Sequence, residues 1–170
     1  MTRGGVKVRR GSNLAAGALV AMLVVAPVGN VAARNIVTAT INGKRHKWKG
    51  RYVLFEVGPS GVIAVASKRA RLGSILPTIG FACPVLLSGA TFPLMPDPAI
   101  CNATYTETKV SRTPATKAWL ATRDVQVTYA SFDGTRLTGT FAAVLDPVPG
   151  NPSPAVTVEG QFRGKVTAGR

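Results

Sequence analysis

Apolar and polar residues alternate along most of the chain after residue 34, and they do so most regularly between residues 155 and 166. One face of this segment carries Val156, Val158, Gly160, Phe162, Gly164 and Val166, and the other carries Thr157, Glu159, Gln161, Arg163 and Lys165. Successive side chains of a β-strand point to opposite faces. This period of two therefore predicts a strand with one buried and one solvent-exposed face.

Short turn sequences separate further alternating segments and predict hairpins. Asn42-Gly43 joins 36–41 to 44–49, Gly58-Pro59-Ser60-Gly61 joins 52–57 to 62–67, and Asp133-Gly134 joins 125–132 to 136–145. Asn-Gly and Asp-Gly favour type I′ turns, in which both central residues have positive φ. With additional strands expected at 75–83 and 104–110, the pattern predicts an all-β fold. We expect a single domain over residues 34–170, an antiparallel β-sandwich or open barrel of about seven to nine strands.

Residues 1–33 have the three parts of a signal peptide. Four basic residues precede residue 14, the stretch 14–26 is uncharged and apolar, and Val31-Ala32-Ala33 places small residues at a cleavage site. As a helix the apolar stretch spans roughly 20 Å, which is shorter than the roughly 30 Å of a bilayer core. The sequence predicts a signal helix that is cleaved between Ala33 and Arg34. The alternative is an uncleaved N-terminal anchor; after cleavage we expect no membrane span.

The charge of the chain is strongly basic. Removing residues 1–33 leaves 17 basic and seven acidic residues, a net charge of +10. Such a charge favours polyanionic partners, among them phospholipid head groups, acidic polysaccharides, teichoic acid and nucleic acid. Export separates the protein from most nucleic acid. An anionic envelope polymer or lipid surface is therefore the favoured partner.

Two cysteines, Cys83 and Cys101, are present. In an exported chain an even number of cysteines indicates a disulfide. The segment between them contains four prolines, so a covalent link would restrain a part of the chain that cannot be regular secondary structure throughout. Two free thiols or half of a metal site are the alternatives, but a metal site needs more histidines or cysteines than this chain has. We predict no metal and no cofactor.

The densest cluster of positive charge lies between residues 44 and 51. It contains Lys44, Arg45, Lys47, Lys49 and Arg51, interleaved with His46 and Trp48. On a strand, Arg45, Lys47, Lys49 and Arg51 would share one face, opposite Lys44, His46 and Trp48. This row of charge suits phosphate or sulfate groups, and Lys68, Arg69 and Arg71 could extend it. Alternatively, the lysines and arginines protect a sheet edge from aggregation, with Trp48 in the core.

Residues for catalysis are sparse. His46 is the single histidine, its cationic neighbours disfavour its protonated form, and no partner that would orient it is recognisable. Four of the seven acidic residues have an evident role in a turn, before a proline or on an outer face, and Glu56 and Glu107 are the candidates without one. The sequence favours a protein that is not an enzyme. The alternative is a small secreted hydrolase whose carboxylate site brings Glu56 and Glu107 together.

Two groups of short motifs resemble those of a known family. Thr38-Ala39-Thr40-Ile41-Asn42-Gly43 followed by Trp48, and Gly139-Thr140-Phe141 followed by Gly160-Gln161-Phe162, are similar to the opening and closing motifs of uncharacterised bacterial secreted proteins and lipoproteins. Many of those proteins have a lipidated cysteine after the signal, and this chain has none there. The resemblance implies a small antiparallel β-sandwich and brings no known activity. Together, the sequence predicts a secreted or periplasmic binding or structural module of the cell envelope.

Overall fold

The computed structural model of the chain describes residues 35–121 and 124–168. The expected signal peptide and its cleavage site between Ala33 and Arg34 lie outside these residues. The described residues form the strands β1 (Ile36–Ile41), β2 (Lys44–Lys49), β3 (Val53–Gly58), β4 (Gly61–Ala66), β5 (Ile75–Cys83), β6 (Asn102–Lys109), β7 (Ala115–Ala121), β8 (Gln126–Phe132), β9 (Arg136–Pro147), β10 (Val156–Lys165) and β11 (Thr167–Ala168), and the short 3-10 helices η1 (Gly50–Tyr52) and η2 (Pro98–Ile100).

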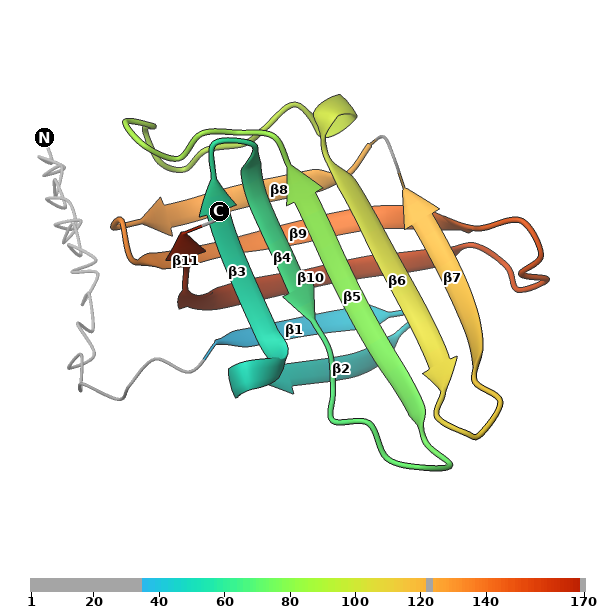
Figure 1. Cartoon of the computed structure of the whole chain (residues 1–170). Helices are drawn as coiled ribbons and strands as arrows, with labels where there is room; N and C mark the ends of the chain where they lie inside the picture. The colour runs from blue at the N-terminus through green and yellow to red at the C-terminus, as the bar shows by residue number, and fades with distance from the viewer. Residues whose placement is uncertain (1–34, 122–123, 169–170) are drawn as a thin grey trace, which may run out of the picture. The chain divides into compact units, whose positions relative to one another are not determined.

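The strands form one curled sheet that folds into two layers. A front layer contains β3, β4, β5, β6 and β7, and a back layer contains β8, β9, β10, β1 and β2. Figure 1 shows the strands of the front layer crossing over those of the back layer. The layers are joined where Leu120 of β7 pairs with Asp146 of β9, and where β11 pairs with β3 in parallel. The described residues thus form a half-barrel, which confirms the predicted all-β class. The sheet is mixed and not antiparallel throughout, since β11 pairs with β3 in parallel, and β7 and β11 come in addition to the predicted strands.

Aromatic side chains from both layers meet in the core. The ring of Phe162 lies with its centroid 5.0 Å from Phe81 and 5.8 Å from Phe55, both in the front layer. Within the back layer, Phe141 is opposite Gly160 in the register of β9 and β10, and Phe162 is opposite Gly139. A Cβ atom on Gly160 would clash with the backbone oxygen of Thr38 on β1 and would lie 2.7 Å from the ring of Phe141. Glycine is therefore required there because the neighbouring strand and the aromatic ring leave no space for a side chain.

The predicted hairpins are present, with one difference in turn geometry. Asn42 and Gly43 have φ values of 46° and 78°, as a type I′ turn requires. At the β8–β9 turn, only Gly134 of the Asp-Gly pair has positive φ, 84°. There the Asp133 carboxylate accepts hydrogen bonds from the backbone N–H groups of Thr135 and Arg136 at 2.8 and 2.6 Å. These bonds stabilise the turn and hold the pKa of Asp133 below its usual value.

A disulfide joins Cys83 at the end of β5 to Cys101 just before β6, as predicted. Both cysteines are buried. The enclosed segment reaches the back layer, where the backbone N–H and C=O groups of Leu94 pair with those of Tyr129 on β8 at 2.9 and 2.8 Å. The bridge therefore restrains a long connection that closes one end of the fold. Within the described part of the chain, neither 3-10 helix nor any other helical segment has the length and apolar character needed to cross a membrane.

Candidate functional site

Three of the predicted cations lie in a row on the outer face of the back layer. In the β1–β2 register, Trp48 is opposite Val37 and both are buried, so the alternate residues Arg45, Lys47 and Lys49 point away from the core. All three are exposed. β2 is also the edge strand of its layer. The placement is therefore compatible with both sequence interpretations, a binding surface and protection of the edge.

The other two predicted members of this site lie elsewhere. Lys44 occupies an inward-facing position, as the alternation predicts. The alternation ends at Lys49, because Gly50 has a φ of 68° and begins η1. Arg51, which follows in η1, donates a hydrogen bond of 3.0 Å to the hydroxyl of Tyr52 and lies over its ring. Arg51 is thus not part of the strand row, contrary to the strict alternation.

Lys68, Arg69 and Arg71 follow β4 in an exposed connection. The Nζ atom of Lys68 lies 5.8 Å from the ring centroid of Trp48, a side chain on the inner side of β2. Lys68 therefore contributes positive charge to the inner side of β2. It does not extend the outer row.

Polar side chains of neighbouring strands continue the outer row across the back layer. The strand registers align three rows: Lys47, Thr38, Gln161, Thr140 and Thr128; Arg45, Thr40, Glu159, Ala142 and Gln126; and Lys49, Ile36, Arg163 and Thr138. Residues that are distant in sequence thus become neighbours on one surface. This surface carries threonine and glutamine in its middle and cations along β2 and at one end of β10.

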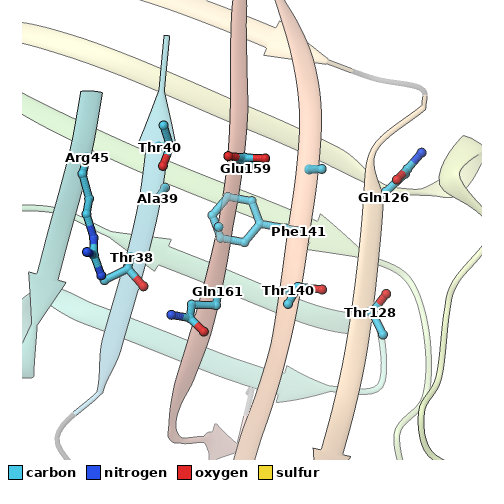
Figure 2. A pocket seen from close by; sticks show the side chains of 12 residues that line it. Thr38, Ala39, Thr40, Arg45, Gln126, Thr128, Thr140, Phe141, Glu159 and Gln161 are labelled. Atoms are coloured by element: carbon cyan, nitrogen blue, oxygen red, sulfur yellow. The ribbon is translucent and has the colours of Figure 1, made fainter. Parts of the chain in front are cut away.

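Two adjoining hollows lie on this surface. The polar hollow has a volume of about 580 Å³ and is lined mainly by threonine, glutamine, Arg45 and Glu159; Figure 2 shows these side chains across five strands. The basic hollow, of about 480 Å³, lies beside it and includes Arg45, Lys47 and Arg163 in its lining. Thr38, Arg45, Thr140 and Gln161 line both hollows. The two hollows therefore form one continuous depression.

Charge is distributed unevenly along this depression. The residues that line the basic hollow include three cations and no acidic side chain. The polar hollow contains Glu159, and a third hollow beyond it adds Asp124. One end of the depression is therefore suited to a negative group. The other end is suited to groups that donate hydrogen bonds.

A separate, smaller pocket of about 320 Å³ lies between the two layers and contains His46. The imidazole ring of His46 stacks on the Trp48 ring, with 5.5 Å between the two centroids. Burial is the largest cause that lowers the pKa of His46, and Lys68 and Lys44 act in the same direction, whereas Glu107 opposes them. The hydroxyl of Tyr105 donates a hydrogen bond of 2.8 Å to Glu107. Burial is the largest cause that raises the pKa of Tyr105. The hydrogen bond to Glu107 and the negative charge of Glu107 act in the same direction.

Glu56 and Glu107 do not meet in a common pocket. Glu107 lines the pocket between the layers. Glu56 alternates with the fully buried Phe55 on β3 and therefore points to the outer side of the front layer. Glu56 and Glu107 are three strand spacings apart across the sheet and five residues apart along the strand direction. Together these separations correspond to roughly 20 Å. This geometry does not provide the carboxylate pair that a glycosidase mechanism uses.

Metal-binding side chains do not gather within the described part of the chain. No group of three or more His, Cys, Asp or Glu side chains with a geometry suited to a metal ion is found there. Both cysteines belong to the disulfide. The sequence matches no protein-family model, and comparisons with curated proteins and with solved structures gave no match. The resemblance to bacterial secreted proteins and lipoproteins stays a prediction.

The hydroxyl and amide groups of the depression were not recognisable as a site from the sequence. The alternation in β10 indicates that Gln161 and Arg163 face outward, but it does not show which strands lie beside them. Thr38 and Thr140 are ordinary strand residues when taken singly. Only the order β9, β10, β1, β2 brings these side chains beside Arg45 and Lys47.

Proposed function

We propose that this chain is an exported, non-enzymatic β protein that binds anionic polymers of the cell envelope through the outer face of its back layer. The observation that carries the proposal is the basic hollow, in which Arg45 and Lys47 of β2 and Arg163 of β10 surround a recess whose lining has no acidic side chain. β2 and β10 are not adjacent, because β1 lies between them. A simple row of edge cations does not account for Arg163.

Several properties support this assignment. The net charge of +10 after residue 33 attracts polyanions from a distance. The three cations line one hollow, in which β2 and β10 lie about 10 Å apart on either side of β1. A negative group placed over β1 is about 5 Å from each of these strands, within the Debye length of about 8 Å at physiological salt, so it interacts with cations of both strands. The disulfide and the signal-like segment 1–33 support export.

Retention on immobilised heparin tests the proposal. The triple variant Arg45→Ala, Lys47→Ala and Lys49→Ala removes the outer row. Its matched control is Lys109→Ala, Arg112→Ala and Lys117→Ala, which removes the same charge from exposed positions on β6, on β7 and in the connection between them. We expect the wild type and the control to elute at similar salt concentrations and the outer-row variant to elute much earlier. Equal retention of the two variants would show that net charge alone causes binding.

Export is tested separately by intact mass. Protein recovered from the medium or periplasm of an expressing bacterium should begin at Arg34 and show no mass increase after alkylation without reductant. A chain that retains residues 1–33 in the membrane fraction would support the anchor alternative.

A further inference from the structure

Hydroxyl and amide side chains occupy the space between the cations of the outer face. Thr38, Thr140 and Gln161 line both the basic and the polar hollow. A threonine hydroxyl and a glutamine amide can each donate and accept hydrogen bonds. The hydroxyl groups of a sugar have the same double capacity. A ligand with negative charges but no hydroxyl groups would bind only the cations. The threonine and glutamine side chains would then stay hydrogen-bonded to water.

The depression is elongated, and its charge changes along its length. From Arg163 to Thr157 it follows seven residues of β10, whose six steps correspond to roughly 20 Å. Arg163 lies at the basic end, whereas Glu159 lies in the polar hollow and also lines the third hollow with Asp124. A negative group is attracted at the first end and repelled at the second. Uncharged hydroxyl groups can instead donate hydrogen bonds to the Glu159 carboxylate.

From these observations we infer that the outer face binds an acidic polysaccharide whose charged sugars are separated by neutral sugars. A carboxylate of the polymer lies between Arg45, Lys47 and Arg163. The hydroxyl groups of the neighbouring neutral sugar donate hydrogen bonds to Thr38, Thr140 and Gln161 and accept hydrogen bonds from them. One of these hydroxyl groups also donates a hydrogen bond to the Glu159 carboxylate. This inference rests on the proposed function and adds the chemical class of the ligand.

A comparison of polymers at equal carboxylate concentration and fixed physiological salt tests the ligand class. The probes are hyaluronate, with a carboxylate on every second sugar, polygalacturonate, with one on every sugar, and polyglutamate, with carboxylates and no hydroxyl groups. We expect affinity to fall in that order, with hyaluronate at least fivefold tighter than polyglutamate. Equal affinity for hyaluronate and polyglutamate would overturn the inference while leaving polyanion binding intact.

The hydroxyl contribution is tested by a double variant, Thr38→Val with Thr140→Val. Valine is close to threonine in shape but lacks the hydroxyl group. Each lost hydrogen bond should weaken hyaluronate binding by about fivefold and leave polyglutamate binding unchanged. The matched control is Thr104→Val with Thr106→Val on β6, in the front layer. If the back-layer and control variants bind hyaluronate equally well, the threonines do not contact the polymer.

The charge pattern is tested by Glu159→Gln. Removing this carboxylate should raise affinity for polygalacturonate several-fold and reduce the preference for hyaluronate. Asp146→Asn is the control, since it removes the same charge from an exposed position near the end of β9. An equal gain in both variants would show a general charge effect and contradict a specific role for Glu159.

Different results would contradict polyanion binding and the preference for a polysaccharide. If the wild type binds none of the three polymers and no vesicle of phosphatidylglycerol, polyanion binding itself is wrong. If it binds phosphatidylglycerol vesicles or polyglutamate as tightly as hyaluronate, polyanion binding holds and the polysaccharide inference is wrong.

Discussion

The disulfide is expected to contribute a large share of the stability of this fold. Cys83 and Cys101 are separated by 18 positions in sequence. Closing a loop of this size stabilises a protein by about 3 kcal/mol in the chain-entropy model. For a domain of this length, that loss corresponds to a fall in Tm of roughly 10 °C. The change is large enough to measure by thermal and by chemical denaturation.

Two samples separate the covalent link from the packing of the cysteines. The variant Cys83→Ala with Cys101→Ala removes both the bond and two buried sulfur atoms, whereas wild-type protein reduced before unfolding keeps the sulfur atoms. We expect both to lose stability, and the double variant to lose at least as much as the reduced protein. Amide exchange at Tyr129 should also accelerate, because its partner Leu94 lies in the segment that the bridge encloses. A Tm that stays unchanged after reduction would show that the disulfide does not stabilise the fold.

Three further predictions concern the core and the pocket between the layers. The Tyr129 hydroxyl is buried without a hydrogen-bond partner among the described residues; Tyr129→Phe should therefore keep or raise stability by about 1 kcal/mol in urea unfolding, and a clear loss would reveal a partner. Gly160→Ala should cost about 1–3 kcal/mol because its Cβ would clash with the backbone oxygen of Thr38 and lie 2.7 Å from the ring of Phe141, and an unchanged unfolding midpoint would contradict this packing. The folded-state pKa of His46 lies below 6.5, so the unfolded chain binds more protons and stability should fall as the pH drops from 6.5 through the folded-state pKa. His46→Gln should reduce this pH dependence of Tm, and an identical profile would show that other groups cause it.

Local signals in the sequence were sufficient for most of the strands and turns. Asn42-Gly43 predicts a tight turn because both of its residues tolerate positive φ, and the alternation in β10 is regular enough to assign its faces. β7 is harder to predict, because Trp119 and Ala121 are its only buried residues and Ala118 lies beside them half-buried. A period of two also shows that one face of a strand is buried without showing which strand lies next to it.

That limit explains what the sequence could and could not predict about the candidate site. The alternation within β2 correctly places Arg45, Lys47 and Lys49 on one face, since this is a property of a single strand. Their proximity to Arg163 depends on the pairing of β1 with both β2 and β10, which is a tertiary property. Arg51 differs from the expectation because Gly50 ends the strand before the next alternate position.

Mapping a ligand onto the protein would show whether anionic polymers bind the outer face of the back layer. Isotope-labelled protein should be titrated with short heparin or hyaluronate fragments while backbone amide signals are followed by NMR. We expect salt-sensitive shifts concentrated on β1, β2, β9 and β10, with the largest near Thr38, Lys47, Gln161 and Arg163. Shifts confined to the front layer, or no shifts at low salt, would contradict it.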